Sequence, residues 1–272
     1  MTMATEQGTV TSQDGATIAY ELSGQGPVIV LVAAALSDRS DTTKLAKLLS
    51  ANFTVINYDR RGRGKSADTK PYSPQREIED IAALIAAGGG SAALFGSSSG
   101  AVLCLDAATS MDNTVTKVAL FEPPLILDDS RPPVGDAFTQ AVTEALNAGN
   151  ASKAVKLFMG KALGVPAFGV IMMRFMPGWS KMVAMAATLP YDLNIVSGIQ
   201  DGKPLPTDRW KVNVPTLILT GQKSEQFFHT GAAALAALLS DATHKILPGV
   251  HHGSVVMSPK SVGEELTAFF KS

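Results

Sequence analysis

The sequence predicts an α/β fold, in which a mostly parallel, doubly wound sheet begins with an N-terminal hairpin and is interrupted by a helical insertion. Strand-like apolar runs alternate with helix-like runs, as they do in parallel sheets flanked by helices. Two runs at 8–12 and 17–22 enclose an Asp14-Gly15 turn, which is typical of a β-hairpin. The alternation stops after Phe121 and resumes at Val214, so we expect the insertion between these residues.

The regular elements follow from the spacing of apolar residues. Val28–Val32 is apolar throughout, as a strand buried on both faces requires. Ile78–Ala87 has apolar residues at helical spacing and is followed by three glycines that end the helix. On the same grounds we expect further strands at 53–58, 91–95, 115–121, 214–220 and 244–247, and further helices around 45–49, 100–110, 232–239 and 262–270.

The insertion is predicted to be helical. No convincing strand lies between Glu122 and Trp210, and apolar residues recur at a spacing of four from Val134 to Leu146, which marks one face of a helix. Further helices are expected around 155–163, 170–176 and 182–187. The predicted organisation is therefore a core made of 1–122 and 211–272, with a helical cap at 123–210.

Composition excludes several classes of protein. Of the 272 residues, 46% are hydrophobic and 17% are charged, so the chain can fold around a large core. A net charge of −1 gives no electrostatic reason to expect nucleic acid or an anionic membrane as a partner. Cys104 is the single cysteine, lies in an apolar helix, and is predicted to be a small buried hydrophobe. The polar N-terminal stretch has no features of a signal peptide, so we expect a cytoplasmic protein.

The strongest chemical motif is Gly96-Ser97-Ser98-Ser99-Gly100, between a buried strand and an apolar helix. This G-x-S-x-G pattern is typical of a nucleophile elbow, a strained strand-to-helix turn that needs very small residues on both sides of the nucleophile. The helix N-terminus also favours developing negative charge. We therefore expect Ser98 to be a catalytic nucleophile, against the simpler alternative that it only caps the helix.

With this motif, nearly the whole chain resembles the α/β-hydrolase superfamily. The segment from Tyr58 to Ser66 resembles a D-x-R-G-x-G-x-S loop that is structural in that superfamily. The segment Leu247–His252 resembles the P-G-x-x-H tail that supplies the catalytic histidine. This resemblance implies His252 as the general base, with His251 as the alternative, and a serine nucleophile needs a base of that type.

The acid of the triad departs from the common pattern. Many relatives have an aspartate where Ser224 stands, and serine cannot support an imidazolium as a carboxylate does. Glu122, at the end of the strand before the insertion, and Glu225 are the two candidates. Because the zearalenone lactonases, which this chain resembles in its Ser98-Ser99-Gly100 context, place the acid at the position of Glu122, we favour Glu122.

The resemblance also implies an oxyanion hole and an apolar binding site. The expected donors are the backbone N–H groups of Ala35 and Ser99, although Ala33-Ala34 replaces the common His-Gly pair. The insertion is rich in methionine and aromatic residues, which suit an adaptable apolar pocket, although these residues could equally serve only to pack the insertion onto the core. Five residues are predicted to bind substrate: Leu36, Met159, Met172, Met176 and Trp179.

These residues predict a serine hydrolase with a Ser-His-Glu triad that cleaves an ester or lactone of a small apolar molecule. No cofactor is implied, and no metal site is expected because the histidines lack partners at ligand spacing. Two alternatives use the same fold: a cofactor-free perhydrolase or haloperoxidase, and a non-catalytic protein that binds a small molecule.

Overall fold

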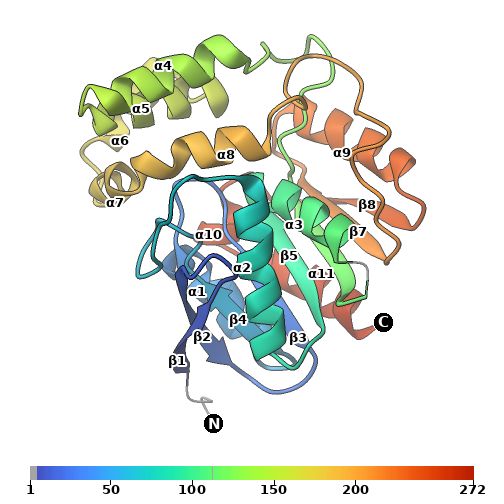
Figure 1. Ribbon diagram of the computed structural model, residues 1–272. Coiled ribbons are helices and arrows are strands. Elements are labelled where there is room, and N and C mark those ends of the chain that lie inside the picture. Colours follow the sequence, from blue (N-terminus) through green and yellow to red (C-terminus); the bar gives the residue numbers. More distant parts are fainter. Residues whose placement is uncertain (1–4, 112) are drawn as a thin grey trace.

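An eight-stranded sheet runs through the centre of the computed structural model, which describes residues 5–111 and 113–272 (Figure 1). The strand order is β1-β2-β4-β3-β5-β6-β7-β8; β1–β2 and β2–β4 are antiparallel pairs, and all later pairs are parallel. The predicted sheet and hairpin are therefore confirmed, while the first four residues of the polar N-terminal stretch lie outside the described chain. The strands are β1 Glu6–Thr11, β2 Thr17–Ser23, β3 Val28–Val32, β4 Thr54–Tyr58, β5 Ala92–Ser97, β6 Val115–Phe121, β7 Thr216–Gly221 and β8 Ala242–Leu247.

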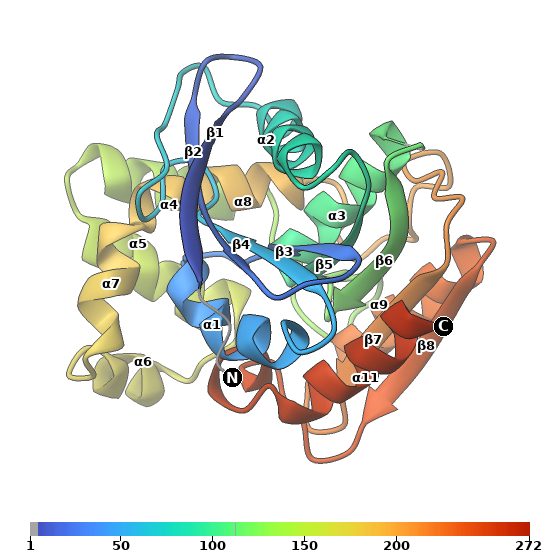
Figure 2. The same cartoon turned by 90° about the horizontal axis from the view of Figure 1, so that it is seen from below.

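Helices cover both faces of the sheet, as a doubly wound fold requires. The helices α1 (Arg39–Leu49) and α11 (Lys260–Lys271) pack on one face, and α2 (Pro74–Ala87), α3 (Ser99–Ser110) and α9 (Gln226–Leu238) pack on the other. Figure 2 shows α1 and α11 on the side of the sheet opposite to α2 and α3. The core is thus two apolar layers with the sheet between them.

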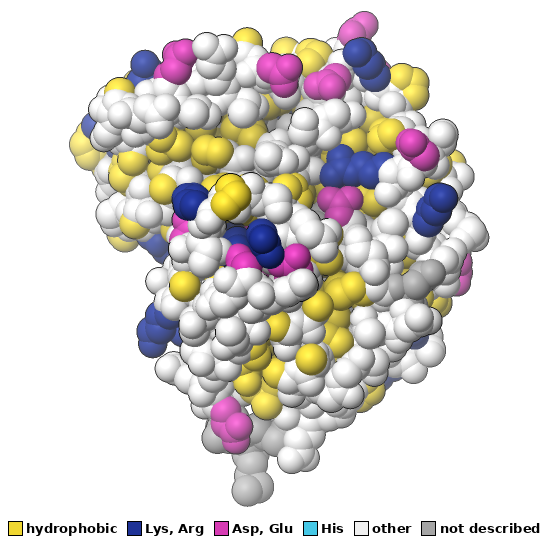
Figure 3. Space-filling model, in the orientation of Figure 1, with side chains coloured by type: hydrophobic (Ala, Val, Ile, Leu, Met, Phe, Trp, Pro, Cys, Tyr) yellow, Lys and Arg dark blue, Asp and Glu magenta, His cyan; other side chains and the backbone are white. Residues whose placement is uncertain are grey.

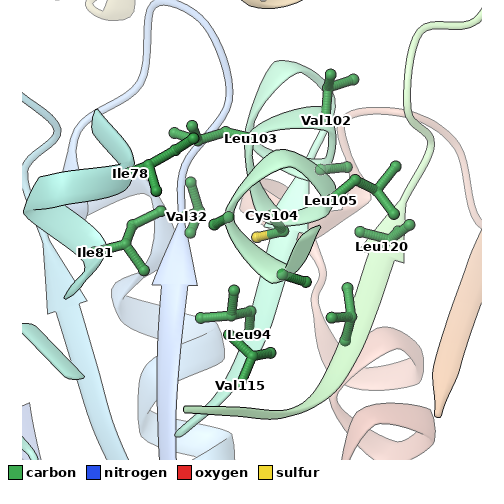
Figure 4. Packing of buried hydrophobic residues seen from close by; sticks show 14 of the residues in the cluster. Val32, Ile78, Ile81, Leu94, Val102, Leu103, Cys104, Leu105, Val115 and Leu120 are labelled. Atoms are coloured by element: carbon green, nitrogen blue, oxygen red, sulfur yellow. The ribbon is translucent and has the colours of Figure 1, made fainter. Parts of the chain in front are cut away.

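The apolar helix α3 has Cys104 at its centre. Figure 4 shows this side chain among buried residues that include Leu94, Val102 and Leu120. Burial raises the pKa of the Cys104 thiol well above its usual range, so the thiol stays protonated and unreactive. The expectation of a buried hydrophobe is confirmed.

The insertion between β6 and β7 is helical, and the structure, which describes all of residues 122–210, has no strand there. In Figure 1 its helices lie together at one end of the sheet. The prediction did not include α8, or the π-helical turn η1 inside the second expected helix. The helices are α4 Asp136–Asn147, α5 Ala151–Leu157, η1 Phe158–Ala162, α6 Ala167–Met173, α7 Gly178–Ala184, the 3₁₀ turn η2 Ala186–Thr188 and α8 Leu189–Ile195.

Several helices of the core begin before the expected segments: α2 by four residues, and α1 and α9 by six residues each. Helix α1 begins six residues before the expected segment, because Asp38 and Asp41 form a capping box that lets a polar turn become helical. A short helix that the sequence did not predict, α10 (Ser254–Met257), follows the predicted histidine loop.

Candidate active site

The nucleophile elbow lies where β5 ends and α3 begins. Ser98 has φ 55° and ψ −122°, a strained conformation for a residue with a side chain. A Cβ on Gly96 would lie 2.2 Å from the Gly100 carbonyl oxygen, and a Cβ on Gly100 would lie 2.4 Å from the Val32 carbonyl oxygen. Only glycine fits at both positions, which explains the spacing of the motif.

We expect Gly100→Ala to destabilise the fold by about 2–3 kcal/mol, because the added methyl group overlaps backbone atoms that cannot move aside. Urea unfolding measures this difference in free energy. Gly178→Ala is the matched control, since nothing lies within 4 Å of a Cβ there, and we expect it to change stability by less than about 1 kcal/mol. Equal stability of the two variants would contradict this account of the elbow.

Glu122 is completely buried at the carboxyl end of β6. Its Oε1 accepts a hydrogen bond of 2.6 Å from the backbone N–H of Gly221, at the end of β7. Its Oε2 lies 2.7 Å from Nδ1 of His252. The carboxylate therefore reaches across from β6 to the end of β7, and both of its oxygens have donors, as a buried carboxylate requires.

His252 lies in the loop between β8 and α10. The backbone N–H groups of Gln222 and Lys223 donate to the carbonyls of Leu247 and Val250, which ties this loop to the end of β7. The Phe228 ring of α9 stacks on the imidazole, with centroids 4.6 Å apart. With Nδ1 bound to Glu122 and one face covered by Phe228, the imidazole has a fixed orientation.

The alternative residues have other contacts. Both carboxylate oxygens of Glu225 accept hydrogen bonds of 3.0 Å from Arg131, and about half of the Glu225 side chain is exposed. Nδ1 of His251 accepts a hydrogen bond from its neighbour Gly253. The structure therefore pairs His252 with Glu122, and places neither Glu225 nor His251 in that pair.

A cavity of about 180 Å³ lies between the elbow and the insertion. Ser98 and His252 both line it, together with Ala35, Leu36 and Met159. Ser99, the other expected oxyanion donor, is the first residue of α3 and is buried beside it. The structure thus brings the expected nucleophile, base and oxyanion loop together at one apolar cavity.

Backbone strain gathers at the same place. Among residues 5–111 and 113–272, the non-glycine residues with positive φ are Leu36, Ser98 and Glu122, at 55°, 55° and 48°. Two of them line the cavity and the third binds His252. Strained residues of this kind persist where the surrounding structure holds them for function.

Three of the predicted substrate-binding residues lie elsewhere. Met172 and Met176 are 50% and 60% exposed and are not among the cavity-lining residues. In the short helix α6, which contains Met172, the buried residue is Val170 instead. Trp179 is buried within the apolar cluster of the insertion, which also holds Leu36 and Met159. Figure 3 shows hydrophobic side chains on the outer surface of the insertion.

The prediction missed several cavity residues. Val255 and Val256 belong to α10, directly after His252, and adjacency to the histidine was the available signal. Phe158, Leu163 and Met182 come from the insertion, and they required knowledge of how it docks. A larger cavity, of about 600 Å³, is lined by residues such as Arg131 and Glu225 and by neither Ser98 nor His252, so we do not take it as the reaction site.

Asp59 anchors the arginine-rich loop after β4. The Asp59 carboxylate accepts hydrogen bonds from Arg39 and from the backbone N–H of Lys65, and Ser66 donates to the Asp59 carbonyl. A Cβ on Gly64 would lie 2.2 Å from the Asp59 carboxylate. These contacts fit the structural role that the resemblance implied for Asp59.

Within residues 5–111 and 113–272, no group of three or more His, Cys, Asp or Glu residues is arranged to hold a metal ion. In the same part of the chain, no helix is both long enough and apolar enough to cross a bilayer.

Comparison with known proteins identifies the family. Residues 16–265 match the model of the alpha/beta hydrolase family, so the chain belongs to that family. The crystal structure of an alpha/beta hydrolase from Sphaerobacter thermophilus is 43% identical, covers 97% of this chain and 100% of its own, and superposes with a TM-score of 0.89.

Two curated relatives extend the comparison. A non-heme chloroperoxidase of Streptomyces lividans is 26% identical over 279 aligned positions, which cover 97% of this chain and all of that protein. An uncharacterised hydrolase of Bacillus subtilis, YraK, is 38% identical over 96 residues, which are only 34% of this chain and 35% of that one. These relatives support hydrolase activity and leave the substrate open.

Proposed function

We propose that this protein is a serine hydrolase that cleaves a carboxylic ester or lactone of a small apolar molecule. The observation that carries the proposal is the 2.7 Å contact between Glu122 Oε2 and His252 Nδ1, beside the cavity that Ser98 and His252 share. A carboxylate on Nδ1 leaves Nε2 of the same imidazole available as a base.

The first half of the reaction forms an acyl-enzyme. Ser98 Oγ attacks the carbonyl carbon, and its proton moves to His252 Nε2. The negative charge that develops on the carbonyl oxygen is bound by the N–H groups of Ala35 and Ser99. The tetrahedral intermediate then breaks its bond to the alcohol oxygen, which takes the proton from His252, and an acyl-serine remains.

The second half releases the acid. Water attacks the acyl carbon and gives a proton to His252, and collapse of the intermediate breaks the bond to Ser98 Oγ, which recovers that proton. Glu122 keeps the imidazole oriented and stabilises its charged form in both halves. Besides the substrate and water, every group that these steps use is supplied by the residues named here.

The size of the cavity sets the expected substrate. At about 180 Å³ it is smaller than usual ligand pockets, so a short acyl group should fit best. Met159 lines this cavity, and its truncation should make room for about two more methylenes of a longer acyl chain. We therefore expect Met159→Ala to raise the ratio of kcat/KM for p-nitrophenyl hexanoate over p-nitrophenyl acetate by about tenfold. Met172→Ala, at an exposed methionine, should leave the ratio unchanged. An unchanged ratio in Met159→Ala would place the acyl group elsewhere.

A second candidate function is perhydrolysis, because the Streptomyces relative is described as a non-heme chloroperoxidase. Hydrogen peroxide would replace water in the second half: one peroxide oxygen bonds to the acyl carbon, the bond to Ser98 Oγ breaks, and a peracid leaves. Bromination of monochlorodimedone in acetate, hydrogen peroxide and bromide measures this activity, and hydrolysis of p-nitrophenyl acetate measures the first candidate.

Covalent labelling separates an enzyme from a non-catalytic binding protein. We expect a fluorophosphonate probe to label the native protein stoichiometrically at Ser98, with a mass increase on the peptide that contains it. A native protein that is neither labelled nor able to turn over an activated ester would overturn the proposed function.

A further inference from the structure

The peptide group between Ala34 and Ala35 is held from one side by an arginine. Arg63 Nη1 donates to the Ala34 carbonyl oxygen at 2.6 Å and to the Ser37 carbonyl oxygen at 3.2 Å. The Ala34 carbonyl and the Ala35 N–H belong to one planar trans unit and point in opposite directions. The guanidinium therefore fixes the direction of the N–H that is expected to bind the oxyanion, and it polarises this N–H into a stronger donor.

The second expected donor is held in a related way. Ser99 Oγ donates to Asp192 Oδ1 at 2.7 Å, which anchors the residue whose N–H is the second expected oxyanion donor. Arg60 Nη1 donates to the same carboxylate oxygen at 2.8 Å and to the carbonyl of Ala33 at 3.1 Å. One arginine thus links the loop after β3 to the start of α3.

Asp192, on helix α8 of the insertion, joins these contacts. Its Oδ2 accepts a hydrogen bond of 2.6 Å from Arg63 Nη2, and its side chain is 2% exposed. Burial alone would raise the pKa of Asp192. The guanidinium groups of Arg63 and Arg60 and the Ser99 hydroxyl lower this pKa by more than burial raises it, so the pKa of Asp192 is below its usual range. The carboxylate is therefore charged while it holds both arginines.

We propose that Asp192 is a positioning residue for the oxyanion hole. Through Arg63 and Ser99, it holds the Ala35 and Ser99 N–H groups in a fixed position and direction relative to the oxyanion that they are expected to bind. This inference rests on the proposed serine hydrolase function. It assigns a catalytic consequence to arginines that the sequence indicated only as scaffold, and to a residue of the insertion. A buried ion pair often adds little to stability. The contacts of Asp192 with Arg60 and Arg63 therefore need an explanation other than joining helix α8 to the loop after β4.

The test compares Asp192→Asn with the native protein on p-nitrophenyl acetate. We expect kcat to fall about 10- to 100-fold with KM little changed, because a misdirected donor loses charge stabilisation that exists only in the transition state. Affinity for a trifluoromethyl ketone, which forms a tetrahedral adduct with a serine, should fall in parallel with kcat/KM. Ser99→Ala, which removes a single anchor, should show a smaller change of the same kind.

Asp80→Asn is the matched control. Asp80 is also a buried aspartate bound to an arginine of the same loop, and accepts hydrogen bonds of 2.9 and 2.7 Å from Arg61, which in turn binds Asp14. We expect Asp80→Asn to lose stability to a similar degree in thermal unfolding, yet to keep kcat within about twofold.

The outcomes are distinguishable from failure of the proposed function. If Ser98→Ala is as active as the native protein, the serine mechanism itself fails. If activity depends on Ser98 but Asp192→Asn keeps the native kcat and analogue affinity, the contacts of Asp192 are only structural and this inference is overturned. The same conclusion follows if Asp80→Asn loses as much kcat as Asp192→Asn. Should Asp192→Asn not fold, the same comparison is made with Ser99→Ala and Arg63→Lys, which keeps the charge and loses the planar fork.

Discussion

Ser98→Ala is expected to lower kcat for ester hydrolysis by about six orders of magnitude, down to the level that binding and the oxyanion hole supply alone. The reason is that loss of the Ser98 hydroxyl removes the acyl-enzyme route completely. Alanine tolerates the strained backbone of position 98 as well as serine does, so the fold should persist. Initial rates with p-nitrophenyl acetate, together with fluorophosphonate labelling, measure the effect.

Ser110→Ala provides the control at the other end of the same helix. Ser110 is exposed, and its hydroxyl donates to the Asp106 carbonyl within α3. We expect native kcat and native labelling for this variant. Labelling that persists in Ser98→Ala would move the nucleophile to another residue and would remove the elbow from the mechanism.

The core of the fold was predictable because its sequence patterns are local. Val28–Val32 and Val115–Phe121 are strands with the expected bounds, since an uninterrupted apolar run has no stable place except a strand covered on both faces. Helix α3 also ends at Ser110, as expected. At the elbow, the glycine spacing reports a steric requirement that any chain with this turn must meet, so the sequence alone located Ser98.

The insertion was less predictable because its contacts are with distant parts of the chain. Helix α8 contains Asp192, whose partners Arg60 and Ser99 lie 132 and 93 positions earlier in the sequence. The residues around Asp192 give no pattern from which these partners could be predicted. Likewise, apolar residues such as Met172 and Met176 suggest a pocket wall, yet which face of a short helix is buried depends on how it docks. The π-helical turn at Phe158–Ala162 has no sequence signal of its own.

The proposed acid of the triad shows how a departure from the common pattern can be compensated from a neighbouring strand. Ser224 stands where the resemblance to the superfamily implied an aspartate, and its Oγ is buried with no hydrogen-bond partner among the described residues. Glu122 instead extends from the neighbouring strand β6, and it takes both the Gly221 N–H at the end of β7 and His252 Nδ1. Adjacent parallel strands end at the same edge, so a carboxylate on either one can reach the same imidazole.

Glu122→Gln is therefore expected to lower kcat by about four orders of magnitude, because a neutral amide cannot stabilise the imidazolium and can hold the wrong tautomer of the histidine. Glutamine has nearly the same shape, and its carbonyl oxygen can still accept the Gly221 N–H, so the loss should exceed any effect on folding. Single-turnover acylation with p-nitrophenyl acetate measures the chemical step directly, and thermal unfolding checks the fold.

Glu225→Gln is the matched comparison, since it changes the other candidate acid in the same way. Its carboxylate binds Arg131 on the side of the larger cavity, so we expect kcat within about threefold of the native value and a small loss of stability, as for a partly exposed ion pair. The opposite result, with Glu225→Gln inactive and Glu122→Gln active, would require the loop after β7 to rearrange in solution so that Glu225 replaces Glu122 at His252. If both variants stayed active, His252 would work without a carboxylate, and the Ser-His-Glu assignment would be wrong while the serine nucleophile remained.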